Sequence, residues 1–143
     1  MEFLGDKEIL NNYKIGFLCS RKVPSNIILK TYDWAIEQRE KGVCIVSGFH
    51  SKIEKDVFHF LLKGTQPIIL VLARSLKKRW EPELADAIQK NRILIISPFT
   101  EKVKRSSQRT ALIRNKIIKE LSDELKIAYV DPGGELKSIL GKS

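Results

Sequence analysis

The sequence predicts an α/β fold, a Rossmann-like three-layer sandwich in which a five-stranded parallel sheet lies between layers of helices. Short β-branched runs alternate with segments of helical periodicity along the chain. Several of these runs end in small or turn-forming residues, as is typical where parallel strands direct their carboxyl ends toward a ligand. The 143 residues suffice for one compact core. We therefore expect residues 1–143 to form a single domain.

The expected strands are short and rich in Ile, Val and Leu, which is typical of strands buried on both faces of a parallel sheet. In chain order they are Tyr13–Cys19, Val43–Ser47, Pro67–Ala73, Arg92–Ser97 and Lys126–Val130. With these strands numbered 1 to 5, we expect the order 3-2-1-4-5. That order would open the ligand crevice between the ends of the first and fourth strands.

Helical spacing of apolar residues fills the intervals between the strands. The four main helices are marked by Ile28 to Ile36, Ile53 to Leu61, Leu84 to Ile88 and Ala111 to Leu121. A short helix is expected around Lys7 to Asn11 and a last one over Glu135 to Leu140. Strands that alternate with helices in this way predict right-handed βαβ units, with helices on both faces of the sheet.

Composition bounds the function. The formal net charge of +9 favours a polyanionic partner or an anionic ligand. No apolar run is long enough to cross a bilayer, and the amino terminus lacks a signal-like apolar stretch, so we expect a cytoplasmic protein without a membrane partner. Cys19 and Cys44 form no CxxC pair, which predicts two reduced, buried thiols. We expect neither a metal nor a cofactor.

Two strand ends carry residues suited to an anion. Ser20 and Arg21 follow the first strand directly and precede a helix start, where a hydroxyl, backbone N–H groups and a guanidinium can hold a phosphate. Ser47 and Gly48 end the second strand, where a glycine lets the backbone approach a ligand closely. Neither GxGxxG nor a Walker A motif is present.

The helix after the fourth strand carries a second basic group. Arg114 shares or borders its core-facing stripe, where the guanidinium either pairs with a carboxylate such as Asp33 or Glu54, or reaches the crevice to hold a phosphate. Asn115 would orient a base, a ribose or the neighbouring loop, and Arg109 would neutralise a phosphate from the same helix.

Five further residues each have more than one interpretation. Glu54 either caps a helix or contacts a ribose hydroxyl or acts as an acid or base. Gly133 and Gly134 form either a plain turn or an anion nest. Phe49 and Phe99 are candidate stacking partners for bases, or core residues. No Ser-His-Asp or Cys-His arrangement has a convincing context, so we predict no catalytic residues.

Three motifs in this order resemble the Rossmann domain of the DNA-processing protein A (DprA, or Smf) family, within the SLOG superfamily that includes the LOG-type phosphoribohydrolases. Ile15 to Arg21 resembles the family's strand ending in Gly-Ser-Arg. Ser47-Gly48-Phe49, followed by Ile53-Glu54, resembles its Ser-Gly-Leu-Ala-x-Gly-Ile-Asp. Arg114 to Ile118 resembles its Arg-Asn-Arg-Ile-Ile. The resemblance runs from about Lys14 to Leu140.

The resemblance implies a cytoplasmic domain that binds single-stranded DNA in a basic crevice, helps to load a recombinase, and tends to form a homodimer. The binding positions it implies are Ser20, Arg21, Ser47, Gly48, Arg114 and Asn115. Departures include Cys19 in place of glycine, Lys52 in place of the second glycine of the strand-two motif, and Glu54 in place of aspartate.

Two functions remain open at this point. The first is non-enzymatic binding of nucleic acid, single-stranded DNA in the first place, for DNA processing or recombination. The second is a nucleotide-binding sensor, or a LOG-like hydrolase acting on a nucleotide's N-glycosidic bond, with Glu54 on the ribose and the Gly133–Gly134 turn on the phosphate. Leu136 and Lys137 stand where the LOG motif Pro-Gly-Gly-x-Gly-Thr has Gly-Thr, which counts against the hydrolase.

Overall fold

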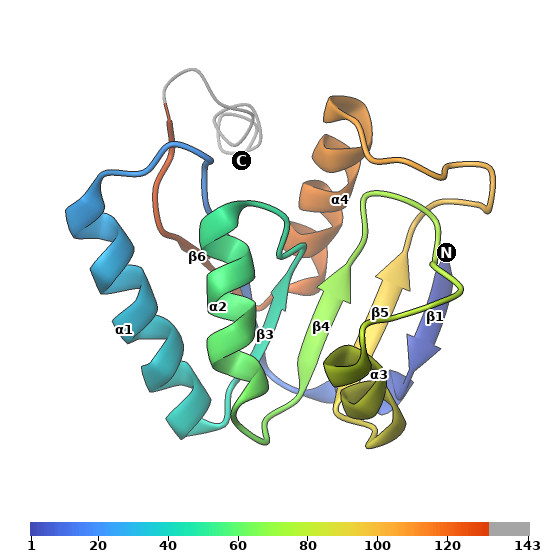
Figure 1. Ribbon diagram of the computed structural model, residues 1–143, viewed down its shortest axis with the longest axis horizontal. Coiled ribbons are helices and arrows are strands. Elements are labelled where there is room, and N and C mark those ends of the chain that lie inside the picture. Colours follow the sequence, from blue (N-terminus) through green and yellow to red (C-terminus); the bar gives the residue numbers. More distant parts are fainter. Residues whose placement is uncertain (132–143) are drawn as a thin grey trace.

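The computed structural model describes residues 1–131, which form a three-layer α/β fold around one six-stranded sheet (Figure 1). The order of the strands across the sheet is β1-β5-β4-β3-β2-β6. In chain order the strands are β1 (Glu2–Gly5), β2 (Lys14–Leu18), β3 (Cys44–Ser47), β4 (Ile68–Val71), β5 (Ile93–Ser97) and β6 (Glu124–Ile127). All five strands expected from the sequence form, although the last lies at Glu124–Ile127 and not at Lys126–Val130, so the α/β class and the parallel core of the sheet are confirmed.

The expectation of a purely parallel, five-stranded sheet was wrong. Residues 2–5 add the edge strand β1, which pairs antiparallel with β5 through the register Phe3 to Ile96. The expected order 3-2-1-4-5 was also wrong, because in the same numbering the five strands lie in the order 4-3-2-1-5. Hydrophobic periodicity identifies buried strands, but it does not encode which neighbour each strand pairs with.

The strand order moves the reversal point of the sheet. The first and fourth expected strands, β2 and β5, are separated by β3 and β4, so no crevice opens between them. The chain instead returns from β5 to the far side of the sheet and pairs β6 with β2, with Phe17 opposite Lys126.

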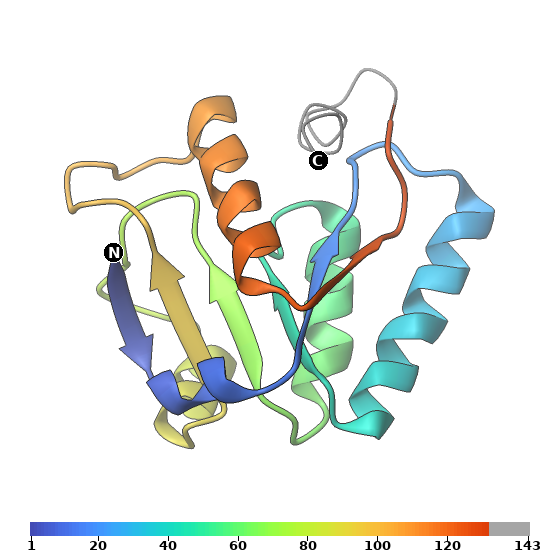
Figure 2. The same ribbon diagram turned by 180° about the vertical axis from the view of Figure 1, so that it is seen from behind.

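Helices cover both faces of the sheet, as expected. On one face lie α1 (Ser25–Lys41), α2 (Lys52–Leu62) and α3 (Pro82–Gln89), and on the other lie the short 3-10 helix η1 (Lys7–Asn11) and α4 (Gln108–Leu121) (Figures 1 and 2). Alternating strand residues supply the two core layers. Phe17, Ile45 and Ile68 pack beneath α1 to α3, and Leu18, Val46 and Ile69 pack toward α4 and η1.

Local sequence signals explain where the helices begin and end. Ser51 and Ser107 cap α2 and α4 through reciprocal hydrogen bonds with the residue three positions later. Gly42 ends α1 in the left-handed conformation at φ 73°, which glycine adopts without strain. The predicted helix over Glu135 to Leu140 lies outside the described residues.

The two cysteines are both buried and not joined in a disulfide, as predicted. Burial raises the pKa of each thiol, Cys19 and Cys44, to about 12. None of the helices within residues 1–131 is long and apolar enough to cross a membrane. In the same part of the chain, no three His, Cys, Asp or Glu side chains are grouped so that they could hold a metal ion.

Candidate nucleic-acid interface

Two adjoining cavities lie at the carboxyl edge of the sheet. The smaller, which we call the α4 pocket, has a volume of about 120 Å³ and lies at the amino terminus of α4. The larger, which we call the α2–α3 cleft, has a volume of about 590 Å³ and extends between those two helices. His50, Ala73, Ser106 and Arg114 line both cavities, so the two are continuous.

The α4 pocket gathers basic side chains from two loops and one helix. Arg21 comes from the β2–α1 loop, His50 from the β3–α2 loop and Arg114 from α4. Ser107 and Gln108 contribute the amino-terminal turn of α4, where the helix dipole favours an anion. A volume of 120 Å³ equals the space of about four water molecules, which suits a phosphate group rather than a whole nucleoside.

Arg114 is held in place from two sides. The side chain is only 6% exposed, and its Nε donates a 2.8 Å hydrogen bond to Oδ1 of Asn115. The guanidinium lies directly over Gly48, where an added Cβ would fall 2.6 Å from Arg114 Cζ. Gly48 has no positive φ, so this position requires glycine for space and not for backbone conformation. The sequence motifs around Gly48 and Arg114 therefore form one unit in space.

The surroundings of His50 change the pKa of its imidazole. Partial burial and, next, the positive charge of Arg114 lower the pKa of His50 below its ordinary value of 6.5. Both effects favour the neutral form of the imidazole. An anion in the α4 pocket would offset the charge of Arg114 and favour protonation of His50.

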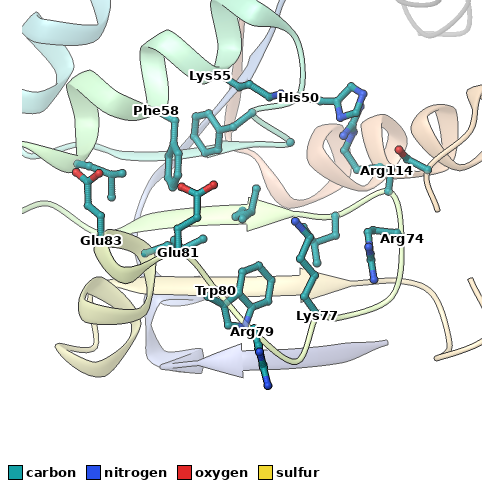
Figure 3. Close-up of a pocket in the computed structure, with 18 of the residues that line it drawn as sticks. His50, Lys55, Phe58, Arg74, Lys77, Arg79, Trp80, Glu81, Glu83 and Arg114 are labelled. Carbon is teal, nitrogen blue, oxygen red and sulfur yellow. The ribbon is translucent and has the colours of Figure 1, made fainter. Parts of the chain in front are cut away.

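The α2–α3 cleft is apolar inside and basic at its rim. Phe58, Leu70, Leu72, Trp80 and Leu84 supply apolar lining. Seven lysines and arginines line the same cleft against two glutamates. Figure 3 shows Phe58 and Trp80 on opposite sides, with His50, Arg74 and Arg114 gathered at one end. The cleft has a volume typical of ligand pockets.

Two predicted site residues, both serines, tie the surrounding loops together. Ser20 is buried: its N–H donates to the carbonyl of Tyr129, and its Oγ accepts from the N–H of Asp131 at 2.9 Å. Ser47 is fully buried and its Oγ accepts from the N–H of Phe49. Ser20 thus joins the end of β2 to the segment that follows β6, and Ser47 joins the end of β3 to the loop that follows it.

Glu54 makes a similar connection between β2 and the start of α2. Its Oε2 accepts from the N–H of Cys19 at 3.1 Å, and its Oε1 accepts from the N–H groups of His50 and Ser51 at 2.9 and 3.2 Å. The side chain is buried. Its two oxygens thus serve three backbone donors, which positions the loop that carries Gly48 and His50.

Other predicted residues do not converge on the two cavities. Arg109 is exposed in the first turn of α4 and lines neither cavity. Phe49 is buried and stacks on Phe58, with ring centroids 4.5 Å apart, and Phe99 is half-buried in the β5–α4 loop. Gly133 and Gly134 lie outside the described residues.

The cleft also includes residues that the sequence did not single out. Trp80 and Glu81 lie in the loop before α3, Arg74 lies three residues after the end of β4, and Lys55 is on α2. Of these residues, only Arg74 could have been predicted as a site residue from the sequence, because it lies near the carboxyl end of a buried strand. Trp80 and Glu81 lie far from the end of β4 in the sequence, and the fold of the loop between them and β4 brings them to the cleft.

Comparison with known proteins adds independent findings. A model of the family described as DNA recombination-mediator protein A matches residues 2–134. A search of curated proteins found no match.

Two solved structures are similar to this chain. One is DNA processing protein A from Helicobacter pylori, described for its single-stranded DNA binding mode, with 22% sequence identity and a TM-score of 0.71. The other is DNA processing protein A (DprA) from Streptococcus pneumoniae, with 21% identity and a TM-score of 0.72. Each match covers 92% of this chain, but the chain spans only 61% and 47% of those two proteins, respectively.

Proposed function

Because this chain belongs to the DNA recombination-mediator protein A family, we propose that it binds single-stranded DNA, without catalysing a reaction, at the carboxyl edge of its sheet. The observation that carries the proposal is the α4 pocket, where Arg21 and Arg114 converge on the amino terminus of α4. Arginine, histidine and helix-terminal N–H groups are the donors that proteins use to hold phosphate. One backbone phosphate would occupy this pocket.

The neighbouring surface supports a strand longer than one nucleotide. Lys77 and Lys104 line the α2–α3 cleft and also a third cavity of about 550 Å³, together with Lys78 and Lys102. Positive charge therefore continues from the α4 pocket along the ends of β4 and β5, as a polyanion requires. The similarity to the Helicobacter pylori protein, which is described as binding single-stranded DNA, agrees with this proposal.

The nucleotide-hydrolase reading has less support. It needs a carboxylate at the ribose, but the oxygens of Glu54 already accept from three backbone N–H groups. We retain the binding role for Arg21, Gly48, Arg114 and Asn115, and we assign to Ser20 and Ser47 the positioning of their loops. The homodimer and the cytoplasmic location stay predictions.

The test is fluorescence anisotropy of a labelled single-stranded oligonucleotide titrated with the protein. Arg21 is exposed, so Arg21→Ala removes one phosphate contact with little effect on the fold. We expect this variant to bind about tenfold more weakly, the effect of one lost charge-assisted hydrogen bond. Lys63→Ala, which removes an exposed charge at the opposite end of α2, is the matched control and should bind like the unmodified protein. Equal weakening in both variants would contradict the proposed site.

A further inference from the structure

The α2–α3 cleft continues from the α4 pocket, but its apolar interior does not suit a phosphate group. Apolar side chains from α2, β4 and α3 form most of its interior. Arg114 lines both cavities. A DNA strand with one phosphate at Arg114 would therefore place the base of that nucleotide, or of the next one, at this cleft. The occupant must therefore be apolar on its faces and attached to an anion, which describes a nucleobase.

Two aromatic rings are placed to hold such a base. Phe58 and Trp80 face the cleft from opposite sides (Figure 3). Phe58 is supported from behind by the buried ring of Phe49, and Lys77 Nζ lies 5.9 Å from the ring centroid of Trp80. A base that packs against either ring would gain stacking on an aromatic face.

Glu81 is an unexpected residue on this basic face. Its side chain lies in the cleft between Phe58 and Trp80 in Figure 3. Glu81 is exposed at the start of α3, and its side chain neither caps the helix nor makes a hydrogen bond or ion pair with the residues that the structure describes. A carboxylate repels phosphate, and Glu81 lines the α2–α3 cleft but not the α4 pocket, so this part of the cleft suits a group that donates hydrogen bonds.

We propose that the α2–α3 cleft binds one base of the strand against the rings of Phe58 and Trp80, with the edge of the base toward Glu81, and that Glu81 selects a base with an amino group. This inference rests on the proposed binding of single-stranded DNA. An ionised carboxylate only accepts hydrogen bonds. Guanine presents N1–H and its N2 amino group side by side and suits Glu81 best. Thymine presents one N–H between two carbonyl oxygens and suits it least.

Trp80 itself reports on the occupancy of the cleft. The chain has two tryptophans, and Trp34 packs elsewhere, on Phe17 with ring centroids 5.2 Å apart. In a Trp34→Phe variant, Trp80 is the sole tryptophan. We expect its fluorescence to be quenched by an oligothymidylate carrying one central guanine, with the same midpoint as the anisotropy. That oligonucleotide should bind about tenfold more tightly than the all-thymine strand.

A Glu81→Gln variant separates recognition from simple electrostatics. Loss of a negative charge alone would tighten binding of both oligonucleotides equally, whereas loss of base recognition removes the preference for guanine. Asp86→Asn changes an exposed acidic residue farther along α3; it is the matched control and should keep the preference.

The inference is overturned if DNA binds by anisotropy while Trp80 fluorescence stays unchanged, or if Glu81→Gln keeps the preference for guanine. In either case the proposed function stands. Absence of anisotropy binding would instead remove the proposed function and this inference with it.

Discussion

At the residue scale, the contact between Gly48 and Arg114 organises the site. The two residues are 66 positions apart in the sequence, and each belongs to a motif that the sequence alone indicated. The sequence did not indicate that the guanidinium would lie against the glycine backbone, because that contact depends on α4 crossing the sheet. Residue types at strand ends were therefore predictable, whereas their contacts required the fold.

A Gly48→Ala substitution tests this contact. The new Cβ would overlap the Arg114 side chain, whose guanidinium moves more readily than the backbone. We expect binding of single-stranded DNA to weaken about tenfold, while the free energy of unfolding stays within about 1 kcal/mol of the original. Gly64→Ala, which crowds the side chain of Arg39 at the opposite edge, is the control measured by anisotropy and urea unfolding. Unchanged binding by Gly48→Ala would contradict the role of Arg114.

His50 predicts a pH dependence. Its pKa is lowered in the unbound protein by burial and by Arg114, and a bound phosphate would raise it again. Binding is then coupled to proton uptake, so affinity should rise as pH falls through the pKa of His50. Anisotropy titrations from pH 8 downward measure this. We expect His50→Gln to flatten the dependence and His59→Gln, the other histidine of the chain, to leave it intact. The same pH profile in both variants would exclude His50 as its source.

At the element scale, the strands and helices were largely predictable and their arrangement was not. Each buried strand contains a run of residues rich in Ile, Val and Leu, which made it predictable, and serine caps mark the starts of α2 and α4. β1 was missed because Glu2 to Gly5 is short and only partly buried. The order of the strands was missed because pairing depends on which face α4 crosses, which periodicity does not encode.

Glu54, near the start of α2, holds the loops at the centre of the site through its hydrogen bonds, so we expect Glu54→Gln to destabilise the fold. An amide offers one acceptor oxygen where the carboxylate offers two, so at least one of the N–H groups of Cys19, His50 and Ser51 loses its partner. We expect the free energy of unfolding to fall by about 2 kcal/mol in urea titrations. Glu40→Gln, at an exposed position on α1, should change it little. Full stability with lost ligand binding would instead favour the ribose-contacting role considered from the sequence.

At the scale of the whole molecule, the positive charge is concentrated where the strands end. Arg74, Lys77, Lys104 and Arg114 all line one cleft at the carboxyl edge of the sheet. The net charge of +9 was visible in the composition, but its placement on one edge follows only from the fold. Local concentration of charge beside an apolar cleft distinguishes a binding surface from a generally basic one.

The central claim, that this edge binds single-stranded DNA, is tested most directly by repeating the anisotropy titration across a salt series. Each phosphate neutralised on a single strand should contribute a slope of about −0.7 in the logarithm of the binding constant against the logarithm of salt concentration. We expect a steep slope for the unmodified protein, and a slope shallower by about 0.7 for an Arg21→Ala/Arg114→Gln double variant that loses the α4 pocket phosphate. Absence of binding at low salt, or an identical slope and affinity in the double variant, would contradict this claim.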